Sequence, residues 1–410
     1  MMAADWLQGP YVYALYEERG FDRAQIGQLF LAGFGSSLAL GTVVGSLADR
    51  LGRRVMSLAY AVIYALACLT KHSSDYWVLM AGRLLGGMST SLLFSVFESW
   101  VGAQHRRLKL KAPLGGLFSE AAFFGNGVAA IASGVTAHVL VESLGLGKTA
   151  PFDLALVLLA LGFALVACTW DENYGAPPGK AGGGESAAGQ FRRAVASIRA
   201  DERVWRTGLS GALFEGAMYC FVFQWTPALA SPGGAPRADV PHGVVFACFM
   251  GACMVGSLAA ERLMRRGPAA RYVRGLFAAS SALLALPAVA NRVLPPALSA
   301  PGTGILVGEG GISASGQLAL AGFVLYEATV GVYWPTVMSL RALYVDESVR
   351  ATVISLFRAP VNLLVCLVLL RSGRLSGDAV FALCSAMVAL SAVLAVGRAG
   401  EGPGRRAGGD

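Results

Sequence analysis

Charged side chains are scarce in this sequence. Only 14% of its 410 residues are Asp, Glu, Lys or Arg, while 55% are hydrophobic, whereas soluble domains carry about 25% charged residues. So few charges cannot cover the surface of a water-soluble protein of this length. The composition therefore predicts a protein whose surface faces mostly lipid.

Residues that mark metal sites, disulfides and catalysis are also sparse or poorly arranged. The four histidines have no metal-ligand spacing, and the seven cysteines form no CxxC pair and lie inside apolar runs, as buried structural thiols do. No nucleophile elbow, phosphate loop or dinucleotide fingerprint is present. The sequence therefore predicts no enzyme, no metal site and no cofactor.

Long apolar runs are what the sequence has instead. Crossing a bilayer takes roughly 20 apolar residues, and the sequence has eleven such runs and a poorer twelfth at 1–17. The poorer run contains Asp5 and Pro10 and resembles the second half of a spanning helix. We therefore expect a truncated first span, and no cleavable signal peptide is evident. The eleven fuller runs lie at 25–49, 55–70, 76–101, 113–142, 151–170, 204–229, 241–261, 272–291, 316–340, 349–371 and 376–397.

The distribution of Lys and Arg predicts the orientation of these spans. Basic residues gather in alternate connections, at 50–54, 106–111 and 262–274, and are few in the others. By the positive-inside rule the basic side is cytoplasmic, and an even number of spans places both termini there. The net charge of +8 is thus explained by topology, and we expect no nucleic-acid partner.

Polar intervals divide the chain. Residues 171–203, rich in Pro, Gly and Arg, predict a flexible cytoplasmic linker between six-helix halves at 1–170 and 204–397. The end of the chain, 398–410, is expected to be a disordered cytoplasmic tail. A Gly- and Pro-rich interval at 293–315 is expected to be a disordered loop on the opposite side.

A loop motif at 45–54 supports the division into halves. Its pattern, Gly-Ser-Leu-Ala-acid-Arg-x-x-Arg-Arg, recurs at 256–266 with a one-residue insertion, as parallel repeats would leave it. We interpret the loop as a latch that biases one access state; the alternative is that its arginines anchor to anionic headgroups. It resembles the major facilitator signature G-x-x-x-D-R-x-G-R-R through Gly45, Asp49, Arg50, Gly52, Arg53 and Arg54.

Charges inside the expected spans are functional candidates, because each costs about 2.5–3.5 kcal/mol on insertion scales. Arg83 and Glu98 fall on one expected helix, and for both a structural ion pair is as good an interpretation as a transport role. Arg358 is favoured as a cavity residue, because Pro360 frees backbone groups that need partners or water. The full set is Asp5, Arg83, Glu98, Glu120, Glu215, Glu327 and Arg358.

Eight stretches form a more specific pattern, spread over nearly the whole chain. They are Asp5-Trp6-Leu7-Gln8-Gly9-Pro10-Tyr11, Leu69-Thr70-Lys71, Gly82-Arg83 with Gly86-Gly87, Leu93-Phe94-Ser95-x-Phe97-Glu98-x-Trp100, Glu172-Asn173-Tyr174, Ala212-Leu213-Phe214-Glu215, Trp225-Thr226-Pro227 and Phe357-Arg358-x-Pro360. Together they resemble the molybdate-anion transporters, a branch of the major facilitator superfamily. Family members begin upstream with a complete first helix, and the interval 293–315 and Glu120 also depart from the family pattern.

The resemblance implies an all-α polytopic protein of the cell membrane with the major facilitator fold, its halves related by a parallel pseudo-repeat. It implies a monomeric secondary transporter that moves molybdate by alternating access and needs no cofactor. Molybdate is a tetrahedral dianion, which suits the planar fork of Arg and neutral donors, although sulfate and tungstate have the same shape and charge. The expected substrate pathway comprises Arg83, Arg358, Asn126, Asn362, Gln8, Tyr11, Trp225 and Trp334.

Uptake of a dianion meets an electrical barrier. Two negative charges entering against about 100 mV cost roughly 4.6 kcal/mol, so proton coupling is expected. Glu215 is the preferred proton carrier, and Glu327, Asp5 and Glu98 are the other candidates.

Two other functions remain open at this point. One is a facilitator for another anion or a small organic solute, although a sugar carrier would place fewer cations in its cavity. The other is a non-transporting membrane receptor or scaffold, which would gain nothing from charges inside its spans.

Overall fold

The computed structural model describes residues 1–109, 114–174, 187–231, 238–294, 312–346 and 349–396. Within these ranges the chain is helical and forms no strand. The expected tail at 398–410 and most of the expected loop at 293–315 lie outside the described residues.

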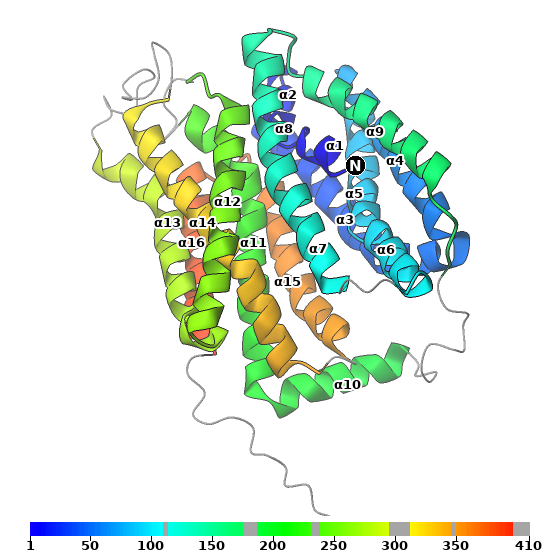
Figure 1. The fold of residues 1–410 in the computed structure, drawn as a ribbon. Coiled ribbons are helices and arrows are strands. Elements are labelled where there is room, and N and C mark those ends of the chain that lie inside the picture. The colour runs from blue at the N-terminus through cyan, green and yellow to red at the C-terminus, as the bar shows by residue number, and fades with distance from the viewer. Residues whose placement is uncertain (110–113, 175–186, 232–237, 295–311, 347–348, 397–410) are drawn as a thin grey trace, which may run out of the picture.

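The N-terminal half forms one bundle, coloured blue to cyan-green in Figure 1. The expected span at 76–101 is interrupted at Phe94 and Ser95, so Arg83 and Glu98 lie on two helices rather than one. The helices are α1 (Met2–Trp6), α2 (Val12–Glu18), α3 (Arg23–Leu51), α4 (Arg53–Leu69), η1 (Thr70–His72), α5 (Tyr76–Leu93), α6 (Val96–Arg107), α7 (Leu114–Ala122), η2 (Phe123–Val128), α8 (Ala129–His138), η3 (Val139–Ser143) and α9 (Ala150–Thr169).

The C-terminal half forms the second bundle, coloured green to red (Figure 1). It consists of α11 (Glu202–Ala230), α12 (His242–Arg266), η5 (Ala269–Arg271), α13 (Val273–Val293), α14 (Ala314–Tyr344), α15 (Arg350–Leu370) and α16 (Gly377–Leu394). Nine helical stretches of the described chain are long and apolar enough to cross a membrane. The two remaining full runs are occupied by α3 and α11, each 29 residues long, so all eleven fuller runs are confirmed as helices.

A helix lies within the interval expected to be a flexible linker. This helix, α10 (Ala187–Ala200), runs across one end of the molecule (Figure 1). Ala194 is buried in a small apolar cluster with Val204, Val345 and Val353, so α10 is fixed to the C-terminal half. We call this end of the molecule the α10 end.

The two halves are joined most tightly at the opposite end, which we call the closed end. Here α8 crosses α12 so closely that a Cβ on Gly134 would lie 2.8 Å from the Gly243 carbonyl oxygen, an approach that small residues permit. Arg23 Nη2 donates to Gln224 Oε1 at 2.6 Å, and Ser372 Oγ donates to the Arg23 carbonyl oxygen at 3.0 Å. These bonds connect α3 to α11 and to the chain that follows α15.

Aromatic rings fill the seam between the halves below these bonds. Phe30 of α3 contacts Phe223 of α11 at 5.5 Å between ring centroids, and Tyr13 of α2 contacts the same ring at 5.6 Å. Such edge-on pairs stabilise a packed interface by about 0.5–1.5 kcal/mol each beyond their burial. The seam is therefore sealed by rings from both halves.

Candidate functional site

Two arginines converge on Glu215, which is buried in α11. Arg341 Nη2 lies 2.8 Å from Glu215 Oε1, and Arg358 Nε lies 2.6 Å from Oε2. The Tyr333 hydroxyl lies 3.1 Å from the same Oε1 and 3.0 Å from the Gly211 carbonyl oxygen. One carboxylate between two guanidinium groups gives this site a formal charge of +1.

Two glycines of α11 make room for this cluster. A Cβ on Gly208 would lie 2.2 Å from the Phe357 ring, and one on Gly211 would lie 3.0 Å from Arg341 Nη2. Gly208, Gly211 and Glu215 are spaced by three and four residues, so they share one face of the helix. The glycines let α14 and α15 approach that face, and their arginines then reach Glu215.

The two arginines differ in what they offer to a ligand. The side chain of Arg341 is 5% exposed, whereas that of Arg358 is 40% exposed. Within the described chain, the terminal amino groups of Arg358 have no partner, so its fork is available to an anion. Sequence reasoning missed Arg341, because the expected span ended at residue 340 while α14 continues to Tyr344.

Arg83 on α5 is the intramembrane arginine candidate of the N-terminal half. Its Nε donates to the Leu29 carbonyl oxygen at 3.1 Å, and its guanidinium carbon lies 4.8 Å from the centroid of the Phe30 ring. A Cβ on Gly33 would lie 2.6 Å from Arg83 Nη2, so this glycine admits the guanidinium. No carboxylate of the described residues pairs with Arg83, and Glu98 is exposed on α6.

A short series of aromatic rings connects the two half-sites. The centroids of Phe30 and Phe34 are 6.1 Å apart, and those of Phe34 and Tyr219 are 5.3 Å apart. Tyr219 in turn lies one helical turn after Glu215 on α11, and the Glu215 carboxylate pairs with Arg358. Arg83 and Arg358 therefore border the same seam from opposite halves.

Three expected pathway residues lie at the closed end instead. Tyr11 is fully buried, donates to Glu142 Oε1 at 3.3 Å and lies 5.6 Å from the His242 ring. Trp225 is 5.8 Å from the same ring, and Gln8 Nε2 donates to the Ala4 carbonyl oxygen at 3.2 Å. In this conformation these side chains fill the seam, and the Tyr11 hydroxyl and the Gln8 amide already donate to oxygen atoms of the protein.

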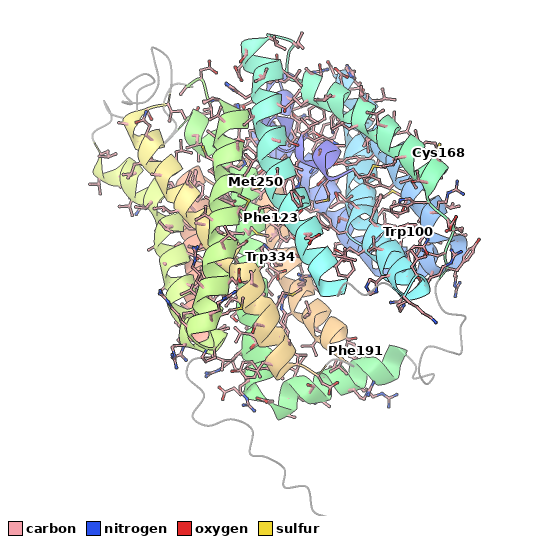
Figure 2. All side chains as sticks on the ribbon, in the orientation of Figure 1. Trp100, Phe123, Cys168, Phe191, Met250 and Trp334 are labelled. Atoms are coloured by element: carbon pink, nitrogen blue, oxygen red, sulfur yellow. The ribbon has the colours of Figure 1, made fainter. Side chains whose placement is uncertain are left out.

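The other three expected pathway residues are accessible. Asn362 is half-buried on α15, one turn after Arg358 and therefore on the same face of that helix. Trp334 is half-buried beside Tyr333, in the central part of the molecule in Figure 2. Asn126 is exposed on η2, a π-helical turn of a kind often found at functional sites.

The acidic candidates have different surroundings. Glu327 on α14 is 6% exposed, and within the described chain it has no hydrogen-bond donor and no cation partner. Asp5 accepts a hydrogen bond from Tyr64 at 2.5 Å. Glu98 and Glu120 are exposed. Among the described residues of the C-terminal half, Glu215 and Glu327 are the two buried glutamates.

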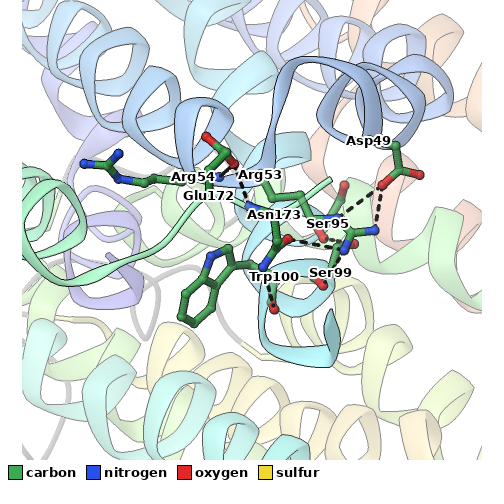
Figure 3. Close-up of polar contacts among 8 residues, drawn as sticks. All are labelled: Asp49, Arg53, Arg54, Ser95, Ser99, Trp100, Glu172 and Asn173. Atoms are coloured by element: carbon green, nitrogen blue, oxygen red, sulfur yellow. Dashed lines mark hydrogen bonds and ion pairs between the residues drawn. The ribbon is translucent and has the colours of Figure 1, made fainter. Parts of the chain in front are cut away.

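The gating loop motif binds the chain that follows α9 (Figure 3). Arg53 Nη2 pairs with Asp49 Oδ1 at 2.7 Å, and Arg53 Nη1 donates to the Ser99 carbonyl oxygen at 3.2 Å and to Asn173 Oδ1 at 3.4 Å. Gly45 lies on α3 ahead of Asp49, and Arg50 is exposed beside it. Within this motif, Asp49 and Arg53 thus form one ion pair that faces residues 171–174.

Glu172 caps the N-terminus of α4, the helix that begins at Arg53 of the motif. Its carboxylate accepts from the backbone N–H of Arg54 at 2.8 Å and of Val55 at 3.1 Å, at the positive end of α4. Gly52 has a φ of +103°, and a Cβ there would lie 2.5 Å from the Glu172 carboxyl carbon. Both the backbone conformation and the lack of space therefore require glycine at this position. Arg54 Nη2 donates to the Ala167 carbonyl oxygen at 2.6 Å.

Comparison with known proteins gives one consistent family. A family model described as sugar transporters with twelve transmembrane segments matches residues 1–323. Proteins named molybdate-anion transporter from Xenopus laevis and Takifugu rubripes are each 36% identical, over 96% and 91% of this chain and 82% and 78% of their own.

Solved structures share the fold at much lower identity. The xylose transporter XylE from E. coli aligns with a TM-score of 0.66 and 12% identity over 98% of this chain and 96% of its own. The nucleoside transporter NupG aligns with a TM-score of 0.65 and 14% identity, over 96% of both chains. The family matches, together with the apolar helices of the two halves, establish a multi-pass membrane protein. The chain belongs to the molybdate-anion transporter family of the major facilitator superfamily.

Proposed function

We propose that this protein is a carrier that moves molybdate across the cell membrane by alternating access, with Arg358 as the main ligand of the anion. The observation that supports this most directly is the cluster around Glu215. It has a formal charge of +1, and its one accessible member is a guanidinium whose terminal groups have no partner within the described chain. An arginine fork donates two parallel hydrogen bonds to an oxyanion, and the relatives named molybdate-anion transporter give the anion its identity.

Arg83 supplies a second cation from the other half. Both arginines border the aromatic seam, so an anion between them would attract both halves and favour closure around it. Such differential attraction is what lets a bound substrate shift the access equilibrium. A neutral sugar, which the family model's description suggests, would leave Arg83 without a counter-ion and the cluster around Glu215 with its net positive charge.

Proton coupling fits Glu327 better than Glu215. The Glu215 carboxylate is the counter-ion of two arginines, so protonating it would leave two buried cations together. Glu327 has no cation partner among the described residues, and a buried carboxylate without one costs several kcal/mol. We propose that Glu327 carries the proton, that the carrier is a monomer, and that the α10 end with both termini faces the cytoplasm.

Molybdate accumulation in cells that lack their own carrier tests the proposal. Cells expressing the wild type should accumulate molybdate in the presence of excess sulfate. Arg358→Ala should abolish accumulation, and Arg358→Lys should restore little, because an ammonium does not reproduce the planar fork. Arg265→Ala is the matched control, since Arg265 is exposed and pairs with Glu261 at 2.8 Å. Accumulation that persists in Arg358→Ala at normal surface expression would refute the assignment.

A further inference from the structure

Lys71 is a buried cation that the proposed site does not use. It lies in η1 at the closed end and is 3% exposed. Its Nζ lies 2.6 Å from the Tyr16 hydroxyl and 5.0 Å from the centroid of the same ring. Within the described chain no carboxylate pairs with it, although lysines are almost never fully buried unless paired.

The local structure holds Lys71 in place. Arg19 Nη2 donates to the Lys71 carbonyl oxygen at 2.9 Å, and Arg19 Nη1 donates to the His72 carbonyl oxygen at 3.1 Å. A Cβ on Gly82 would lie 1.9 Å from Thr70 Oγ1, so η1 packs directly on α5. The fold therefore fixes the position of this ammonium group firmly. Lys71 lies on a packed helical turn, whereas a lone lysine between two spans suggests a flexible surface loop.

The same packing brings Lys71 near Arg83. Thr70 packs on Gly82, and Lys71 and Arg83 are the residues that immediately follow these two in the chain, so η1 and α5 place the two cations next to one contact point. Neither cation has a carboxylate partner in the described chain. A buried cation near a second, half-buried cation without a counter-ion is unfavourable, unless an anion joins them in another state of the protein.

The aromatic seam decides when an anion can reach this pair. Tyr16 belongs to the apolar cluster that also contains Phe30 of α3 and Phe223 of α11. Within this cluster Tyr16 contacts Lys71, and Phe30 contacts both Arg83 and Phe223. Separation of the halves at this end would withdraw Phe223 from Phe30 and open the cluster beside Arg83, next to which η1 holds Lys71.

We propose that Lys71 and Arg83 form a second binding site for the transported oxyanion, which is occupied when the closed end opens. This proposal rests on the proposed function and adds Lys71 to the residues that bind the anion. The anion would bind first between Lys71 and Arg83 and then pass to Arg358 as the seam closes. Lys71 would thus determine the apparent affinity from that side of the membrane.

Uptake kinetics over a range of molybdate concentrations test this site. Lys71→Gln should raise the KM by about tenfold with the maximal rate changed less, the loss expected for one charge-assisted contact. Lys71→Arg should stay within about threefold of the wild type, because the charge is kept. Lys148→Gln is the matched control at the same end, since Lys148 is on the surface and pairs with Glu18 at 3.2 Å.

Tyr16→Phe separates anion binding from a merely structural role. It removes the hydroxyl partner of Lys71 but keeps the ring and the ammonium charge. We expect its KM to equal that of the wild type. A tenfold increase in Tyr16→Phe, or an unchanged KM in Lys71→Gln, would overturn the proposal. If Lys71→Gln does not reach the membrane, Lys71→Met takes its place, because Met preserves the apolar stem of the side chain.

The wild type distinguishes the two possible failures. If the wild type does not accumulate molybdate, the proposed substrate is wrong, and the second site falls with it. If the wild type accumulates molybdate and Arg358→Ala does not, but Lys71→Gln keeps the wild-type KM, only the second site is wrong.

Discussion

Replacing Glu215 tests whether one carboxylate holds the two arginines of the site. Glu215→Gln preserves the size of the side chain but changes the formal charge of the cluster from +1 to +2. Arg341, whose side chain is 5% exposed, would then be a buried cation without a counter-ion. Removing one partner of a buried ion pair costs about 3–5 kcal/mol. Arg358 is 40% exposed, so water solvates its charge when Glu215 is neutral. We therefore expect the destabilisation by Glu215→Gln to be at the lower limit, about 3 kcal/mol.

A double mutant makes this prediction specific. Arg341→Met leaves Glu215 paired with Arg358 and should cost about 1–2 kcal/mol. Adding Glu215→Gln to Arg341→Met removes both members of the buried pair, so the double mutant should be more stable than Glu215→Gln alone. Contacting charges are the kind of pair for which such non-additivity is expected, at about 0.5–3 kcal/mol.

Thermal inactivation in detergent provides the measurement. The fraction of protein that remains monodisperse after heating gives an apparent midpoint for each variant under one heating protocol, which suits a membrane protein that unfolds irreversibly. Asp201→Asn is the control, because Asp201 forms a half-exposed ion pair with Arg203 at 2.9 Å whose loss should change little, and Asn keeps an oxygen that can accept from the Arg203 backbone N–H at the start of α11. Equal midpoints for the wild type and Glu215→Gln, or strictly additive effects, would refute the reasoning.

Three other perturbations address the closed end, the gating loop and coupling. A Cβ on Gly373 would lie 2.9 Å from that of Ala24, so a local shift of about 1 Å brings the two to disulfide distance. Oxidised Ala24→Cys/Gly373→Cys should therefore lose transport and regain it on reduction, and unchanged transport by cross-linked protein would exclude opening at this end. Glu172→Gln should lower stability by about 0.5–2 kcal/mol, because α4 loses a charged cap, and a midpoint equal to the wild type would contradict that role. Glu327→Gln should flatten the dependence of uptake on external pH while molybdate still binds, and a pH profile like that of the wild type would exclude Glu327 as the proton carrier.

Much of the architecture follows from the sequence because lipid is a demanding solvent. A spanning segment must satisfy its backbone internally and present apolar side chains, so each of the eleven fuller runs could be located from composition alone. The sequence also reveals the repeat of 45–54 at 256–266 and the scattered family motifs, because both depend only on residue order along the chain. The sequence likewise indicated Arg83, Glu215 and Arg358, since a charge inside an apolar run is conspicuous.

The tertiary structure decided which of these residues act together. Glu215 and its two arginines come from three helices, and only packing at Gly208 and Gly211 brings them within hydrogen-bond distance. Arg341 lies beyond the expected end of its span, and Lys71 looks like an ordinary loop residue until η1 packs on α5. Burial and partnership are properties of contacts between distant segments, so local composition determines where a helix crosses the membrane but not which charges meet inside it.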